Sequence, residues 1–277
     1  MSDLYTSSVF TEQGGFTRGI EGPGCDAQGN LYAVNFERQQ TIGRVTPEGE
    51  CSIFLELSDG STGNGIRFDS QGRMYIADYT GHNILRVDME TRAIDVHAHE
   101  ATMNQPNDIA IGADDCIYAS DPNWAESTGQ IWRIDTDGSV HLLEADMGTT
   151  NGIEVSPGED RLYVNESVQR TVWAYDLSAG QITNKQLLIE FPDFGMDGMR
   201  CDVEGNLYIT RHGKGTIAKL SPAGEVLLEV ELTGKLPSNI AFGGPNGCTA
   251  YVMLQDEGNV EVFRVEAPGR EWKLAQR

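Results

Sequence analysis

Six polar residues recur along the chain at nearly constant spacing, and all of them carry side-chain oxygens. Successive members are separated by 43, 43, 44, 46 and 42 residues, and a tyrosine follows each one 11 or 12 positions later. Two of the side chains are carboxylates and the other four are carboxamides. The six are Glu21, Asn64, Asn107, Asn151, Asp197 and Asn239. The spacing indicates a repeated unit that brings its leading residues to equivalent places.

If the six leading residues surround one axis, they form an all-oxygen ring with two negative charges. Buried carboxylates need a cation or other partners, and a divalent ion matches two carboxylates in charge. Oxygen donors without Cys or His favour Ca²⁺, with Mg²⁺, Mn²⁺ or Fe²⁺ as alternatives, and disfavour Zn²⁺. Alternatively, the Asn-Gly and Asp-Gly pairs are strand-entry turns, and Asn64 and Asn239 fit that interpretation best. Glutamate has no turn preference, so Glu21 is the strongest indication of a metal.

Each repeat of about 43 residues contains four short strand-like runs separated by turns rich in Asp, Gly and Ser. This pattern is typical of a propeller blade, so we expect an all-β, six-bladed β-propeller with four-stranded blades and a central metal-binding channel. We expect one domain over residues 1–277. Residues 7–12 (SSVFTE) should add the outer strand of the last blade, although residues 270–275 (REWKLA) compete for that place.

Other residues of the repeat have structural or supporting roles in this interpretation. The repeated tyrosines should pack between blades, and Cys25 and Cys201 should fill core positions. Three residues after each tyrosine lies a second set of side chains, and its members are Asn35, Asp78, Asp121, Glu166, Arg211 and Leu254. Asp121 is a candidate for an alternative base or for a residue that supports the site. Arg211 is expected to pair with Asp197 or Glu166, with orientation of a substrate oxygen as the alternative. His212 and Trp124 are expected to lie near the substrate.

The charge and the cysteines limit the function further. A formal net charge of −22, from 42 acidic and 20 basic residues, repels phosphate backbones and anionic membranes. We therefore expect a small-molecule substrate, no nucleic-acid or membrane partner, and a monomer or weak homo-oligomer. Five widely spaced cysteines without a C-x-x-C pair, and no secretory pattern in the first thirty residues, favour reduced thiols in a cytoplasmic protein.

Four segments carry a resemblance to a known family. They are IEGP at 20–23, PND at 106–108, TNGIEVSP at 150–157 and DGMRCDVEGNLYIT at 197–210. Together they resemble the senescence marker protein / gluconolactonase family, and squid diisopropyl fluorophosphatase shares the frame. The resemblance implies a divalent cation in the channel held by Glu21, Asn151 and Asp197, with Asn107 completing the shell or orienting the substrate. The squid enzyme's second, structural calcium has an aspartate where Arg200 stands, so that site is not carried over.

These observations predict a metal-dependent lactonase that opens a small neutral aldonolactone. Asp197 would act as general base or nucleophile, Glu21 as a pure ligand, and Asn107 would hold the substrate carbonyl or a water. One alternative is a calcium-dependent phosphotriesterase of the diisopropyl fluorophosphatase kind. Another is a propeller that serves as an interaction platform, with the ion only a structural pin.

Overall fold

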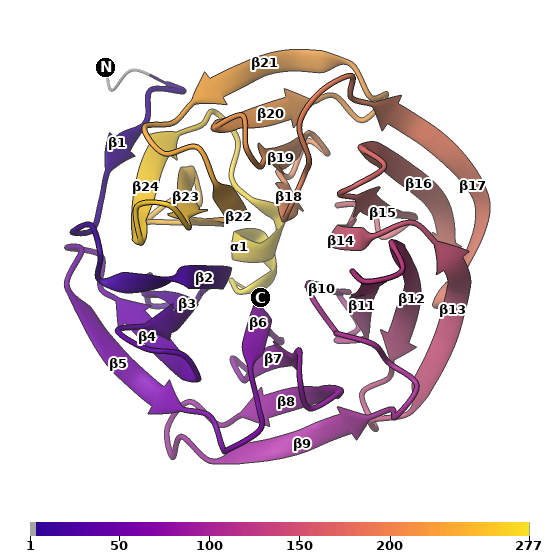
Figure 1. The fold of residues 1–277 in the computed structure, drawn as a ribbon, viewed down its shortest axis with the longest axis horizontal. Coiled ribbons are helices and arrows are strands. Elements are labelled where there is room, and N and C mark those ends of the chain that lie inside the picture. The colour runs from indigo at the N-terminus through magenta and orange to yellow at the C-terminus, as the bar shows by residue number, and fades with distance from the viewer. Residues whose placement is uncertain (1–3, 277) are drawn as a thin grey trace.

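The computed structural model describes residues 4–276 and contains six four-stranded antiparallel sheets arranged radially around a channel (Figure 1). The innermost strands are β2 (Phe16–Cys25), β6 (Gly63–Phe68), β10 (Ile109–Ile111), β14 (Thr150–Val155), β18 (Met199–Cys201) and β22 (Pro237–Gly243). The second strands are β3 (Leu31–Phe36), β7 (Met74–Asp78), β11 (Ile117–Asn123), β15 (Arg161–Glu166), β19 (Leu207–Arg211) and β23 (Thr249–Leu254). The predicted six-bladed propeller is confirmed.

The third strands are β4 (Thr41–Val45), β8 (Asn83–Val87), β12 (Thr128–Ile134), β16 (Thr171–Ser178), β20 (Thr216–Leu220) and β24 (Asn259–Arg264). The outer strands are β5 (Cys51–Glu56), β9 (Ile94–His99), β13 (Val140–Met147), β17 (Gln181–Glu190), β21 (Val226–Glu231) and β1 (Ser8–Val9). We number the blades 1 to 6 by their inner strands, from β2 to β22.

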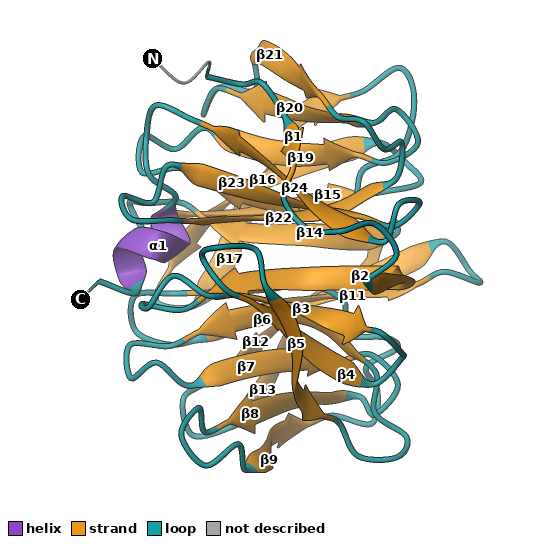
Figure 2. Cartoon of the chain, turned by 90° about the vertical axis from the view of Figure 1, so that its left-hand side faces the viewer, coloured by secondary structure: helices purple, strands orange, loops and turns teal. Residues whose placement is uncertain are grey.

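The ring is closed by the N-terminal segment, as predicted. Strand β1 pairs antiparallel with β24, so Ser8 lies opposite Val262 in blade 6. Residues 270–275 do not form the competing strand, and that alternative is wrong. Instead Arg270–Leu274 form the short helix α1, which lies at one face of the disc near the channel (Figure 2). Pro268 and Gly269 end the extended chain, and the following Arg, Glu, Lys and Leu are good helix formers.

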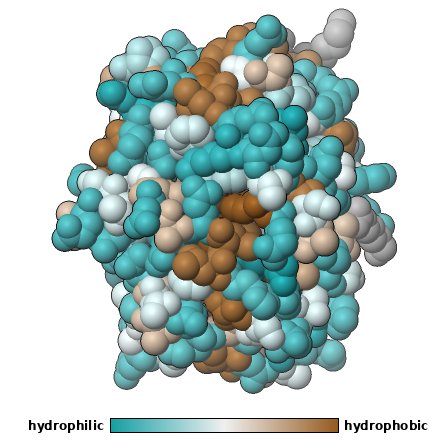
Figure 3. All heavy atoms as spheres, turned by 90° about the vertical axis from the view of Figure 1, so that its right-hand side faces the viewer, coloured by the Kyte–Doolittle hydropathy of each residue, from teal (hydrophilic) through white to brown (hydrophobic). Residues whose placement is uncertain are grey.

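The repeated tyrosines pack between blades, which confirms their predicted role. Tyr32 of blade 1 belongs to the apolar cluster around Ile66 and Ile76 of blade 2, and Tyr208 of blade 5 belongs to the cluster of blade 6. Burial decreases from the axis to the rim: β14 is wholly buried, whereas most of β17 is exposed or half-buried. On the rim that faces the viewer in Figure 3, hydrophilic surface surrounds scattered hydrophobic groups. The inner strands therefore form the most buried part of the molecule.

The remaining sequence features match their expected surroundings. Gly29, Gly72 and Gly205 of the repeated turns have φ of 87°, 75° and 87°, a backbone conformation that suits glycine. Cys25 and Cys201 are buried, and all five cysteines lie among the described residues and are free. Within residues 4–276, no helix has the length and apolar character needed to cross a bilayer.

Candidate metal centre in the channel

The leading residues of the repeats reach the channel because the inner strands are irregular at that point. In blades 1, 2, 4 and 6 the pairing of the inner strand with its neighbour shifts register at the leading residue, between Glu21 and Gly24 in blade 1 and between Thr150 and Ile153 in blade 4. Bulges re-aim side chains and are frequent beside functional sites. Asn107 and Asp197 lie just before the short strands β10 and β18.

The glycine after a leading residue permits close approach of neighbouring blades. A Cβ on Gly152 would lie 2.7 Å from the carbonyl oxygen of Asp197 and 2.8 Å from the nitrogen of Met199. The Gly152 N–H donates to that Asp197 oxygen at 3.1 Å, and the Gly65 N–H donates to the Asn107 oxygen at 2.8 Å. Because Asn64, Asn151 and Asn239 lie inside strands, the strand-entry turn interpretation is wrong for them.

The two carboxylates meet, as the spacing predicted. The carboxyl groups of Glu21 and Asp197 are close enough for each to affect the charge of the other. Glu21 is buried and accepts hydrogen bonds from the Gly22 N–H at 2.6 Å and from Asn239 Nδ2 at 3.0 Å. Burial and the charge of Asp108 raise the pKa of Glu21 from its ordinary 4.5 to about 7. Burial and the charge of Glu21 raise the pKa of Asp197 well above its usual range. The Glu21 and Asp197 carboxylates therefore lack a cation that would stabilise their charged forms.

Amide oxygens beside this pair have no hydrogen-bond donor among the described residues. The buried Oδ1 atoms of Asn64, Asn107 and Asn151 all have this property. Asn151 Nδ2 donates to Ser167 Oγ at 3.0 Å, which fixes the orientation of its amide. Asn239 differs, because its amide donates to Glu21 and its Oδ1 accepts the Ile240 N–H at 2.9 Å. A buried carbonyl without a donor is costly unless a cation binds it.

The donor set therefore fits a hard divalent cation. Glu21, Asn107, Asn151 and Asp197 would hold it, and Asn64, a ring member for which the sequence left a turn role open, would offer a further amide oxygen. No group of three or more His, Cys, Asp or Glu side chains suited to a metal occurs in residues 4–276, so a zinc-type site is not found there. The candidate site depends on carboxylates and amides together.

A second group of charged side chains in the channel forms ion pairs among its own members. Arg200 pairs with Asp108 at 2.9 Å, and Arg270 of α1 pairs with Glu154 at 3.4 Å. Asp108 also accepts from Arg67 at 3.4 Å. These ion pairs join the guanidinium groups of Arg67, Arg200 and Arg270 to the carboxylates of Asp108, Glu154, Glu271 and the half-buried Glu159. This set has no excess of positive charge, so it does not compensate the two negative charges of Glu21 and Asp197.

A cavity of about 470 Å³ opens beside the ring, and most of its lining residues belong to blade 4 and to the loop between blades 4 and 5. Asp197 and Asn151 line it, whereas Glu21 and Asn107 are not in its wall. The predicted positions of Trp124 and His212 near the pocket are confirmed. The complete lining is Trp124, Asn151, Ser167, Val168, Arg170, Phe194, Gly195, Met196, Asp197 and His212. Its size suits a small molecule such as a sugar lactone.

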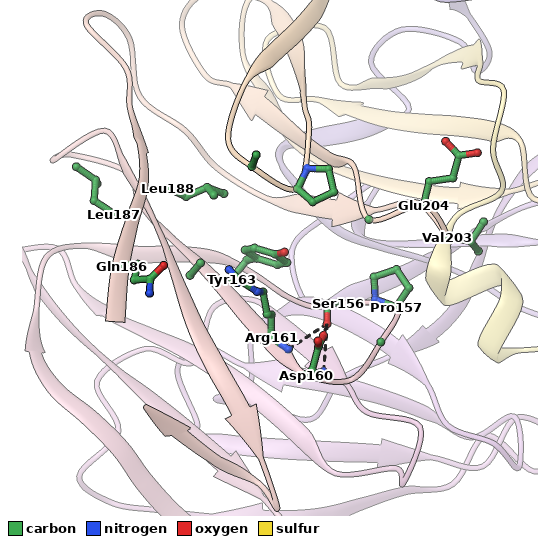
Figure 4. Close-up of a pocket in the computed structure, with 15 residues that line it drawn as sticks. Ser156, Pro157, Asp160, Arg161, Tyr163, Gln186, Leu187, Leu188, Val203 and Glu204 are labelled. Atoms are coloured by element: carbon green, nitrogen blue, oxygen red, sulfur yellow. Dashed lines mark hydrogen bonds between the residues drawn. The ribbon is translucent and has the colours of Figure 1, made fainter. Parts of the chain in front are cut away.

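A larger cavity of about 630 Å³ lies at the other end of β14 (Figure 4). Its wall includes Ser156, Asp160 and Tyr163, and Ser156 Oγ donates to Asp160 at 2.8 Å. None of the six leading residues lines it. The smaller cavity is therefore the candidate substrate site, because it alone of the two contains side chains of the ring.

Asp121, the third candidate catalytic residue, lies on β11, the second strand of blade 3. Its carboxylate accepts hydrogen bonds from the backbone N–H groups of Asn104 and Gln105, from Gln130 Nε2 and from Trp132 Nε1, at 2.6 to 3.0 Å. Burial raises its pKa. These contacts fix the loop that leads into Asn107, which favours the supporting role over that of a base.

The predicted partners of Arg211 are wrong. Its guanidinium pairs with Asp193 at 2.7 Å and with Glu229 at 3.5 Å, not with Asp197 or Glu166. Glu166 instead accepts the Gly148 N–H at 2.7 Å and the Thr171 hydroxyl at 2.8 Å. Asp193, in the loop before blade 5, and Glu229, on the outer strand β21, are the carboxylates that reach Arg211. No repeat position in the sequence signalled this pairing.

Sequence comparison identifies the family to which this propeller belongs. Residues 20–255 match the family described as SMP-30/Gluconolactonase/LRE-like region, and the chain belongs to this family. A gluconolactonase from Zymomonas mobilis is 28% identical over 269 residues, which covers 84% of this chain and 75% of that protein. A pentonolactonase from Haloferax volcanii is 31% identical over 239 residues, covering 80% and 76%.

Solved structures show the same fold. The structure of a protein described as a gluconolactonase superposes with a TM-score of 0.82 at 20% identity, covering 95% of this chain and 93% of the other. A calcium-binding regucalcin from Agrobacterium tumefaciens superposes with a TM-score of 0.80 at 22% identity, covering 95% and 97%. At these identities the structural likeness concerns the fold alone.

Proposed function

We propose that this protein is a lactonase that opens a small sugar lactone and requires a divalent cation, with Ca²⁺ the best match to the oxygen donors. One observation carries the proposal: two mutually destabilising carboxylates lie beside three buried amide oxygens that have no donor. The Zymomonas and Haloferax relatives are named as lactonases of sugar acids, which supports the substrate class.

Glu21 and Asp197 have different roles in this proposal, because only Asp197 lines the cavity. Glu21 is buried outside the cavity wall, so its role is to bind the cation. Asp197 belongs to both the carboxylate pair and the cavity wall, so it can accept a proton from a water that attacks the lactone carbonyl. A bound cation would polarise that carbonyl and acidify water. Asn151, held by Ser167, keeps its oxygen fixed beside this place.

A pH-indicator assay with gluconolactone and a pentonolactone tests the proposal. We expect acid release that stops after chelation and returns with Ca²⁺. Asp197→Asn should lower kcat at least about 1,000-fold, because it removes both a ligand and the base. Asp137→Asn, on an exposed loop of blade 3, is the matched control and should leave activity unchanged.

Three results would contradict the proposal. Acid release that ignores chelation would exclude the cation. Hydrolysis of a fluorophosphate without hydrolysis of any lactone would favour the phosphotriesterase alternative. A folded, Ca²⁺-loaded protein that hydrolyses neither substrate would favour the interaction platform.

A further inference from the structure

Arg170 projects from the loop between β15 and β16 into the wall of the 470 Å³ cavity. Its backbone is fixed on both sides. The Arg170 N–H donates to the Glu166 oxygen at 2.8 Å, and its carbonyl accepts the Phe191 N–H at 2.9 Å. The residue has a φ of 63°, so the root of the side chain is held in one unusual conformation. The root of the Arg170 side chain is therefore fixed at the wall of the cavity.

The Arg170 guanidinium has no carboxylate partner within residues 4–276. It makes no ion pair there, and its Nε is buried without a hydrogen-bond acceptor. The chain has 42 acidic and only 20 basic residues, so partners are abundant. The neighbouring arginine in the fold, Arg211, pairs with Asp193 and Glu229. The Arg170 guanidinium can therefore still donate charge-assisted hydrogen bonds to a ligand in the candidate substrate cavity.

The rest of the cavity suits a ring with an apolar face and a charged end. Trp124 and Phe194 line it and are 40% and 47% exposed, which is uncommon for large aromatic side chains. Asp197 and Asn151 occupy the part next to the candidate cation site. Arg170 is thus the cationic group available to the part of the substrate that is not reacting.

We propose that the substrate is a sugar lactone bearing a second, anionic group, a carboxylate or another oxyanion, which the Arg170 guanidinium binds. This inference rests on the proposed lactonase function and names its substrate class. The net charge of −22 favours a neutral substrate at long range, but charges beyond about 10 Å are largely screened at physiological salt. At contact, the planar guanidinium can donate two parallel hydrogen bonds to an oxyanion, and such bonds are stronger than those to neutral hydroxyls.

Two lactones of the same ring size and stereochemistry provide the test, an aldonolactone and the aldarolactone in which a carboxylate replaces the terminal hydroxymethyl group. The wild type should favour the carboxylate-bearing lactone in kcat/KM by at least about 10-fold. Arg170→Met should lower kcat/KM for that lactone about 10- to 100-fold, mainly through KM, and change the value for the neutral lactone by less than about 3-fold. Arg170→Lys should retain part of the preference.

Arg161→Met is the matched control, because Arg161 lines the other cavity and its loss changes the net charge equally. It should leave the preference intact. Equal losses for both lactones in Arg170→Met, or a wild-type preference for the neutral lactone, would overturn the inference.

Calorimetry with the ring-opened acids separates this inference from the proposed function. With Ca²⁺ present, the diacid should bind the wild type at least about 10-fold more tightly than the monoacid, and Arg170→Met should abolish the difference. This result would support Arg170 as an anion-binding residue even if neither lactone were hydrolysed. Equal binding of both acids to the wild type would contradict it.

Discussion

Replacing Glu21 with Gln should stabilise the metal-free protein while removing cation binding. The Glu21 carboxylate is buried beside Asp197, and burial and the charge of Asp108 raise its pKa to about 7. A glutamine oxygen can still accept from the Gly22 N–H and from Asn239, and its amide can donate to Asp197. The substitution therefore keeps the existing hydrogen bonds and removes the repulsion.

The magnitude follows from the pKa. A rise from 4.5 to about 7 corresponds to about 3 kcal/mol of unfolding free energy, at about 1.4 kcal/mol per unit. Between these values the folded protein binds more protons than the unfolded chain, so wild-type stability falls as pH rises from 4.5 to 7. Glu21→Gln should thus exceed the metal-free wild type by about 3 kcal/mol, or about 6 °C in Tm, at pH 8. Near pH 5 the difference should fall to about 1 kcal/mol or less.

The assay is urea or thermal unfolding in chelator at pH 5 and pH 8, repeated with saturating Ca²⁺. With Ca²⁺ the order should reverse, because only the wild type gains stability from binding. Asp108→Asn is the matched control: it is also a buried carboxyl-to-amide change, but it leaves Arg67 and Arg200 short of a partner and should destabilise by about 3–5 kcal/mol. A Glu21→Gln variant no more stable than wild type in chelator at pH 8 would refute the reasoning.

Two further substitutions test the surroundings of the ring. Gly152→Ala should destabilise by about 1–3 kcal/mol and weaken Ca²⁺ binding at least about 10-fold, since its Cβ would push the Asp197 backbone away; calorimetry and urea unfolding measure both, and unchanged affinity would refute the close-packing account. Arg270→Met should destabilise by about 3–5 kcal/mol, more at pH 8 than at pH 5, because it leaves the buried Glu154 carboxylate without its cation. Equal loss at both pH values would contradict that pairing.

The repeat was enough to predict the propeller and the meeting of Glu21 with Asp197, because residues at equivalent places in equivalent blades must lie at equivalent heights in the channel. It could not predict the second group of charged side chains. Arg67, Glu154 and Arg200 each lie three positions after a leading residue, and in a regular strand that position faces away from the ring. The bulges in blades 2 and 4 turn Arg67 and Glu154 toward the axis. In blade 5, Asp197 lies before strand β18 begins, so strand alternation does not relate it to Arg200.

The sequence did not predict helix α1 or the role of Arg170, and the reasons differ. Five residues are too few to show helical periodicity, and α1 is held largely by partners such as Glu154 and Phe242 that lie far away in the chain. Arg170 lies in a loop of ordinary composition, and its lack of a partner depends on which carboxylates the fold places elsewhere. Such long-range pairings leave no local signal.

The claim that Glu21, Asn107, Asn151 and Asp197 together hold one cation is tested most directly by crystals of the protein grown with Mn²⁺ or Ca²⁺. An anomalous difference map should show one peak on the channel axis, with oxygens of these four residues about 2.1–2.6 Å away. No peak on the axis in crystals soaked at saturating metal, or a peak bound by other residues, would contradict the account.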